Sequence, residues 1–125
     1  MLLAYGFLRK VFEVFEKYRT SIDMITTSEV AVSLTIDNKE NLADIVQELQ
    51  AFGTVEIDED QTIVSIVGNE IAQTPQVMMR LFDAINNIPV RMVSYGGSRH
   101  NVSLLIPAEY KTTTLQVLNK GLFHL

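Results

Sequence analysis

The sequence has 125 residues, of which 47% are apolar and 20% charged, with 10 Lys and Arg against 15 Asp and Glu and no Cys. This is the composition of a folded chain, and the length suits one ordinary domain or two very small ones. The net charge of −5 argues against binding to a nucleic-acid backbone and favours a cationic ligand. The lack of cysteine excludes disulfides and thiolate chemistry and fits a cytoplasmic setting, and no apolar run is long enough to span a membrane.

Taken in chain order, the hydrophobic pattern of the first half predicts alternating helices and strands. A helix is expected over 7–18, where apolar residues recur at helical spacing. Strands are expected over 21–27 and 30–36, where β-branched residues gather or alternate with polar ones. A second helix should carry the apolar stripe within 42–49, and a short strand is expected at 55–57.

The same order begins again in the second half. We expect a strand over 62–67 and then a helix after Thr74-Pro75, where threonine can cap the helix and proline takes its first position. Strands over 90–95 and 102–106 and a last helix over 109–119 follow. The order strand-helix-strand-strand-helix therefore recurs with a period of roughly 70 residues.

A repeated βαββαβ order predicts an α+β chain of two ferredoxin-like modules, each an antiparallel sheet with helices on one face. We place the modules at residues 1–60 and 61–125, with the acidic run 58–60 as a solvated turn. Two complete copies need eight strands. The pattern supplies seven, which are the six ranges above and one before the first helix, so the second module should lack one strand and leave an open sheet edge. We therefore expect the chain to be a piece of something larger.

The sequence offers little for catalysis or metal binding. Its two histidines, His100 and His124, have no partner at the spacing of metal ligands. The run Gly96-Gly97-Ser98 joins two expected strands instead of leading into a helix, so it predicts a turn and not a phosphate-binding loop. Motifs of nucleophilic catalysis are absent, and we expect no catalytic residue, metal ion or cofactor in this chain.

One polar stretch stands out, the nine residues from Ser21 to Glu29, which hold two carboxylates and four hydroxyls. Strand alternation puts Ser21, Asp23 and Ile25 on one face. Asp23 lies between apolar neighbours in mid-strand, where a charge is costly unless it is paired. The residues by themselves leave two interpretations open: a solvated outer face, or a polar end of the sheet that holds a zwitterion opposite a helix start.

Several runs match a known family. They are G-F-L at 6–8 followed by V-F at 11–12, S-I-D-M-I-T-T-S-E-V at 21–30, I-V-G-N at 66–69 and R-M-V-S-Y-G-G-S-R-H-N at 91–101. With these runs, nearly the whole chain closely resembles the C-terminal regulatory region of lysine-sensitive aspartokinases, a tandem of ACT modules. The resemblance implies an upstream kinase domain that would carry the catalytic residues, ATP and Mg²⁺, none of which has a counterpart here.

The resemblance also implies how the chain works. First modules from two subunits would pair side by side into one sheet with L-lysine at the interface, and lysine would inhibit the kinase by feedback. In this family the first module is inserted into the second, so a strand before residue 1 would complete the second sheet. The implied partners are L-lysine, a second copy and the kinase domain, without nucleic acid or membrane.

The implied lysine site combines the start of the first helix with the polar strand. Backbone N–H groups near Phe7 and Leu8 suit the effector carboxylate, while Asp23 and Glu29 offer carboxylates to its two ammonium groups, in an order that stays open. The expected set is Met1, Ala4, Gly6, Phe7, Leu8, Ser21, Ile22, Asp23, Thr27, Ser28 and Glu29.

Two departures limit this expectation. The family often has Ser-Arg where this chain has Ala4-Tyr5, so a hydroxyl contact at position 4 is lost. The second module has Arg91 where the first has Asp23, so it should not bind the same cation and is expected to serve dimer packing. Two other functions stay open: a stand-alone double-ACT regulator that senses an amino acid and acts through a partner, and a structural dimerisation module without a ligand.

Overall fold

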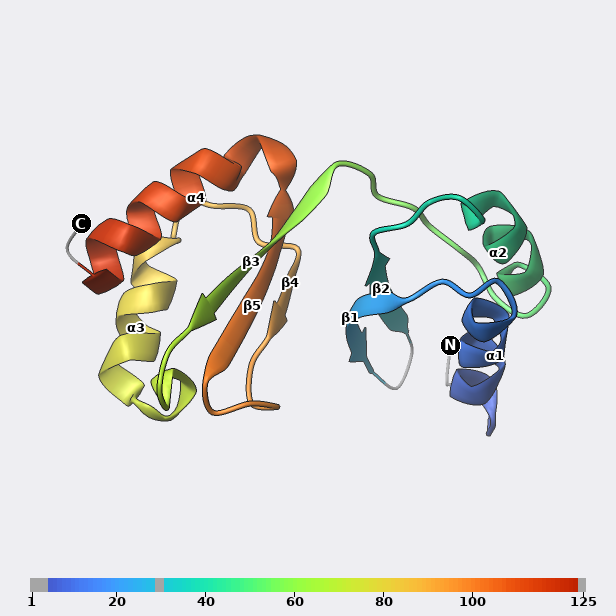
Figure 1. Cartoon of the computed structure of the whole chain (residues 1–125), viewed down its shortest axis with the longest axis horizontal. Helices are drawn as coiled ribbons and strands as arrows, with labels where there is room; N and C mark the ends of the chain where they lie inside the picture. Colours follow the sequence, from blue (N-terminus) through green and yellow to red (C-terminus); the bar gives the residue numbers. More distant parts are fainter. Residues whose placement is uncertain (1–4, 29–30, 124–125) are drawn as a thin grey trace. The chain divides into compact units, whose positions relative to one another are not determined.

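The computed structural model describes residues 5–28 and 31–123. The chain divides into two compact units, Met1–Ile57 and Asp58–Leu125 (Figure 1). This division falls just before the expected boundary between residues 60 and 61. Each unit is described by itself.

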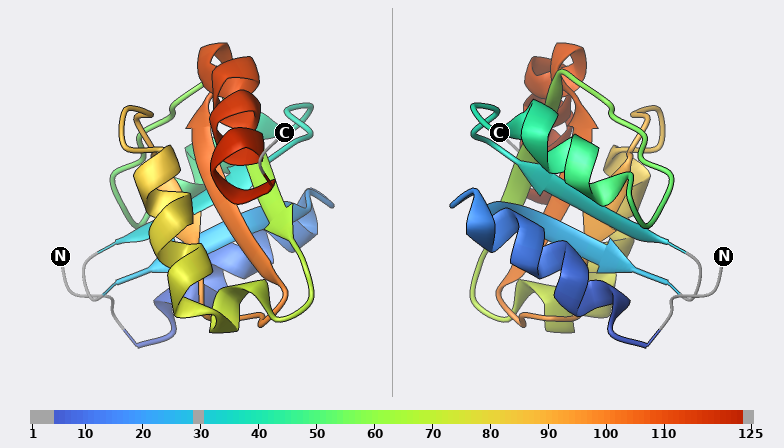
Figure 2. Two further views of the ribbon diagram at one scale, coloured as in Figure 1. Left: turned by 90° about the vertical axis from the view of Figure 1, so that its left-hand side faces the viewer. Right: turned by 90° about the vertical axis from the view of Figure 1, so that its right-hand side faces the viewer.

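Unit 1 is a β-hairpin covered by two helices. Its elements are α1 (Phe7–Lys17), β1 (Ile22–Thr27), β2 (Val32–Ile36) and α2 (Leu42–Leu49). The two strands are antiparallel, and both helices lie on the same face of the hairpin (Figure 2). The core of this unit is a buried cluster of Val11, Val14, Phe15 and Ile45.

The spacing of these apolar residues explains why α1 packs as it does. Val11, Val14 and Phe15 lie three and four positions apart and form one buried stripe, as the sequence predicts. Before the helix, Gly6 adopts a φ of +83°, a left-handed conformation that glycine enters without steric cost. On the exposed side, Arg9 Nε donates to Glu13 Oε1 at 2.8 Å, one helical turn away.

Unit 2 is a three-stranded antiparallel sheet of order β3-β5-β4. Its strands are β3 (Gln61–Val67), β4 (Met92–Ser94) and β5 (Asn101–Pro107), and its longer helices are α3 (Pro75–Ala84) and α4 (Lys111–Leu118). Short turns of other helix types, η1 (Ile71–Gln73), η2 (Ala108–Tyr110) and η3 (Asn119–Phe123), adjoin the two helices. In the central strand, Val102, Leu104 and Ile106 have no exposed surface, so the core lies between this strand and the helices.

The α+β class with antiparallel sheets and helices on one face is confirmed, but the expected strand at 55–57 is wrong. This segment lies in no strand, and Ile57 is 50% exposed. A strand exists only through a hydrogen-bonded neighbour, and two apolar residues bury too little surface to hold the segment against one. The strand that the pattern needs before α1 falls on residues 1–4, outside the described residues. The described part of the chain therefore has five of the seven expected strands.

Candidate functional site

The predicted site residues fall on two elements of unit 1. Gly6, Phe7 and Leu8 lie at the start of α1, and Ser21, Ile22, Asp23, Thr27 and Ser28 lie along β1 and its two ends. Met1, Ala4 and Glu29 lie outside the described residues. The start of α1 and the end of β1 lie at the same end of the unit (Figure 2), and Thr27 is the last residue of β1.

Strand β1 presents the polar side chains on its outer face. Met24 is 7% exposed and faces the core, whereas Asp23, Ile25 and Thr27 are exposed. The alternation inferred from the sequence is therefore confirmed. Among the described residues no ion pair involves Asp23, so its carboxylate is available to a cation.

A β-bulge in β1 shapes the backbone at Asp23. Ile22 pairs with Ile36 and Ile25 pairs with Leu34, so Asp23 and Met24 together face the single residue Thr35. The backbone N–H of Met24 donates to the Thr35 hydroxyl at 2.9 Å. The sequence reasoning missed this role of Thr35 in the backbone at Asp23, because strand alternation predicts faces but does not reveal where a register shifts.

Helix α1 begins after Gly6, a residue without a side chain that could cap it. The first N–H groups of a helix have no acceptor within it, and no acidic residue lies in the first turn of α1. Such a terminus carries partial positive charge and favours an anion. In the predicted site, Phe7 and Leu8 therefore supply backbone donors suited to a carboxylate.

The counterpart of Asp23 in unit 2 is already paired. Arg91 Nη2 lies 2.9 Å from Asp58 Oδ2, which neutralises the guanidinium. The main-chain oxygen of Asp60 also accepts from Ala108 N at 2.7 Å. The acidic run 58–60 is exposed, as expected of a turn, but it also anchors two other segments of unit 2.

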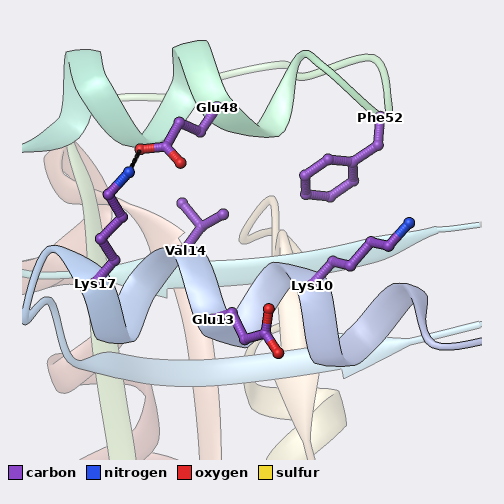
Figure 3. Close-up of a pocket in the computed structure, with 6 residues that line it drawn as sticks. All are labelled: Lys10, Glu13, Val14, Lys17, Glu48 and Phe52. Atoms are coloured by element: carbon purple, nitrogen blue, oxygen red, sulfur yellow. Dashed lines mark hydrogen bonds and ion pairs between the residues drawn. The ribbon is translucent and has the colours of Figure 1, made fainter.

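A shallow pocket of about 250 Å³ lies between α1 and α2 (Figure 3). Its lining residues are Lys10, Glu13, Val14, Lys17, Glu48 and Phe52. None of them belongs to the predicted site. Lys17 Nζ lies 3.0 Å from Glu48 Oε2, and the Tyr18 hydroxyl donates to the same oxygen. We interpret the pocket as part of the contact between the two helices.

These contacts shift the pKa values of three side chains, Glu48, Lys17 and Tyr18. The Tyr18 hydroxyl and then the Lys17 ammonium hold the pKa of Glu48 below its ordinary value. The hydrogen bond to Glu48 raises the pKa of Lys17, and it also raises the pKa of Tyr18. Both neighbours therefore favour the ionised carboxylate of Glu48 over its protonated form.

Neither a metal site nor a membrane span is found in the part of the chain that the structure describes. No group of three or more His, Asp or Glu side chains there could hold a metal ion. None of the helices described is long and apolar enough to cross a membrane.

The fold therefore defines a tandem of ferredoxin-like α+β modules, with exposed polar residues on β1 and a glycine before the first helix of the first module. The family model for the ACT domain matches residues 64–122. A structure from Porphyromonas gingivalis W83, solved as a candidate C-terminal regulatory domain of aspartate kinase, is 48% identical with a TM-score of 0.86, over 98% of this chain and 84% of that chain.

Longer aspartokinases are similar over nearly all of this chain. Lysine-sensitive aspartokinase 3 of Escherichia coli K12 is 34% identical over 98% of this chain and 29% of its own length. The crystal structure of E. coli aspartokinase III in complex with lysine and aspartate, in its T-state, superposes with a TM-score of 0.85, at 34% identity over 98% of this chain and 29% of that chain. The chain belongs to the family of aspartokinase C-terminal regulatory regions, built from ACT domains. It spans less than a third of the length of the E. coli enzyme.

Proposed function

We propose that this chain is the sensor of an aspartate kinase and that it binds L-lysine in unit 1 for feedback inhibition. The observation that carries the proposal is the S-I-D-M-I-T-T-S-E-V run, whose described part includes strand β1 with Asp23 and Thr27 exposed, at the end of the unit where α1 begins (Figure 2). Likeness to a lysine-sensitive kinase supports the choice of effector. The catalytic residues, ATP, Mg²⁺ and the phosphorylation of aspartate would belong to a kinase domain upstream, in a cytoplasmic protein.

Within one copy, the predicted site is split along β1. Asp23 and Thr27 lie four residues apart, which at about 3.3 Å per residue separates them by about 13 Å. This is longer than an extended lysine molecule. One copy therefore cannot offer both Asp23 and the Thr27 end of the strand to a single lysine.

A second copy would join the two halves. β1 pairs with β2 on one side, and no strand among the described residues pairs with its other edge. If two copies of β1 pair antiparallel about a twofold axis at Ile25, each Asp23 lies directly across from the partner's Thr27 on the same face. The 39% exposed Ile25 side chains would then cover each other at the axis.

This arrangement creates two equal sites per dimer, each with matching charges. Asp23 of one copy would take one ammonium group of lysine, and the α1 start of the other copy would take its carboxylate. Glu29, which follows β1 in the sequence, would supply the second carboxylate from that same copy. Threonine has no second ammonium group and should bind more weakly.

Isothermal titration of the 125-residue chain with L-lysine tests the proposal. We expect heat from lysine and little from L-threonine. Asp23→Asn keeps the side-chain shape and removes the charge, and it should weaken lysine binding by about 10- to 100-fold, since a charged hydrogen bond is worth about 1.5–3 kcal/mol.

The matched control is Asp83→Asn, which makes the same change at an exposed position of α3 in unit 2 and should leave affinity unchanged. Absence of lysine binding by a folded dimer would overturn the choice of effector. Equal affinity of Asp23→Asn and the unsubstituted chain would overturn the role of Asp23.

A further inference from the structure

Two segments of unit 2 are fastened to each other by main-chain contacts. They are the loop between β4 and β5 and the connection between β3 and α3. Gly68 N donates to the carbonyl of His100 at 3.0 Å, and Ala72 N donates to the carbonyl of Arg99 at 2.9 Å. The Tyr95 hydroxyl donates to the carbonyl of Ala72 at 3.3 Å. These three hydrogen bonds hold the β4–β5 loop against the β3–α3 connection.

A side chain completes this closure. His100 Nδ1 accepts from the backbone N–H of Glu70 at 2.8 Å, while His100 N donates to Ser98 Oγ at 3.1 Å. An imidazole nitrogen accepts only when it carries no proton, so this bond requires a neutral ring protonated at Nε2. A second proton would place an N–H at Nδ1 against the N–H of Glu70, and the bond would be lost.

The backbone that receives this bond is strained. Glu70 has φ +54° and ψ 29°, the left-handed conformation that residues with a side chain rarely adopt. Its carbonyl accepts from Thr74 Oγ1 at 3.3 Å, at the residue before α3 begins. Loss of the bond to His100 would free Glu70 to leave this conformation, and the Thr74 contact would carry the change to the start of α3.

The charged groups at this closure act in opposite directions on a protonated ring. Arg99 Nη1 lies 3.6 Å from Glu70 Oε1, so the guanidinium repels an imidazolium and the carboxylate attracts it. The remaining titratable group of the loop, the Tyr95 hydroxyl, is held by the Ala72 carbonyl. The geometric conflict at Nδ1 acts whichever of the two charges prevails.

We propose that His100 is a pH-sensitive latch in unit 2, closed when its imidazole is neutral and open when the ring is protonated. Histidine is the side chain whose charge ordinarily changes between about pH 5 and 8. In the repeated strand and helix order, the fastened segments correspond to the start of α1 and the β1–β2 turn of unit 1. The latch therefore lies at the unit 2 counterpart of the candidate lysine site.

Nuclear magnetic resonance of the full 125-residue chain tests the latch. Between about pH 7.5 and 5, the amide resonances of Glu70 and Ala72 should shift together with the imidazole of His100. Protection of these two amides from hydrogen exchange, corrected for the intrinsic rate, should fall by about tenfold or more toward pH 5.

Two substitutions separate the imidazole from other causes. His100→Asn keeps an acceptor near the position of Nδ1 but does not titrate, so protection of the Glu70 amide should persist at pH 5. Glu70→Gln removes the carboxylate and should leave the pH response in place, and His124→Asn, at the other histidine, should also leave it. Undiminished protection at pH 5 in the unsubstituted chain would overturn the proposal, as would a pH response that survives in His100→Asn or disappears in Glu70→Gln.

Discussion

At the scale of single residues, the hydroxyl of Thr35 in β2 supports the neighbouring strand β1. Asp23 and Met24 face one residue of β2, so the ladder leaves one N–H without its regular partner. The hydroxyl takes that N–H, and the bulged strand presents Asp23 outward. The side chain acts through the backbone and not by contact with a ligand.

Thr35→Val is therefore expected to weaken lysine binding. Valine keeps the shape of threonine but offers no acceptor, so the Met24 N–H loses its partner at a cost of about 0.5–1.5 kcal/mol. Titration calorimetry should show reduced affinity, and urea unfolding a matching loss of stability. Thr35→Ser keeps the acceptor and should bind nearly as the unsubstituted chain does. Equal lysine affinity in Thr35→Val would show that the hydroxyl does not position Asp23.

At the scale of elements, the contact between α1 and α2 depends on pH through Glu48. Its pKa is lowered in the folded chain by Tyr18 and Lys17, from an ordinary value of 4.5. A lowered carboxylate pKa stabilises the fold above the ordinary value, and this contribution is lost as the pH falls through the folded value.

Glu48→Gln should therefore flatten the acid limb of the stability profile. Urea unfolding between about pH 7 and 3 should show a smaller acid loss in the variant than in the unsubstituted chain. The matched control is Glu109→Gln, at an exposed residue of η2, which should keep the original profile. If Glu48→Gln and the unsubstituted chain lost the same free energy of unfolding at low pH, Glu48 would not be the source of this pH dependence.

The packing of η3 on α3 depends on a glycine. A Cβ at Gly121 would lie 2.8 Å from the Cβ of Ala84, closer than real Cβ contacts allow, so the two helical segments would have to move apart. Gly121→Ala should destabilise the chain by about 1–2 kcal/mol in urea unfolding, after the small helical gain of alanine is subtracted.

Gly97→Ala is the control, because a Cβ at this position would meet no atom within 4 Å and its φ lies outside the left-handed region. It should change stability by less than about 0.5 kcal/mol. If Gly121→Ala were equally neutral, the close approach of η3 and α3 would not limit the residue at this position.

At the scale of the whole molecule, the proposed dimer rests on the edge of β1 that pairs with no other strand in the described part of the chain. Ile25 is 39% exposed and would lie on the axis between two copies. Ile25→Lys places like charges directly across from each other, which disfavours pairing. Sedimentation should show a folded monomer, and lysine affinity should fall because each site takes residues from two copies. A dimer that persists with full lysine binding would exclude pairing at this edge.

The control for this experiment is Ile57→Lys, which makes the same change at a 50% exposed residue of unit 1 that lies in no strand. It should leave both the dimer and lysine binding in place. Circular dichroism of both variants should match the unsubstituted chain, because each side chain already faces outward.

The sequence by itself determined the α+β class, the repeated order of elements and the outer face of β1. Those features follow from local periodicity, since apolar spacing decides which side of a helix or strand is buried. The resemblance of a few runs was enough to predict the family. The strand expected at 55–57 is absent. Two apolar residues, Val55 and Ile57, match a strand pattern, but a strand also needs a neighbouring strand to pair with.

Only the tertiary structure decided the features that depend on which residues meet across the sheet. The bulge held by Thr35, the pairing of Arg91 with Asp58 and the closure of unit 2 by His100 each join residues far apart in the sequence. No periodicity encodes such contacts, because register and loop closure are set by hydrogen-bond geometry after the chain has folded. The acidic residues that give the chain its negative charge therefore differ in role. Asp58 pairs with Arg91 within the fold, and Asp23 forms no ion pair among the described residues.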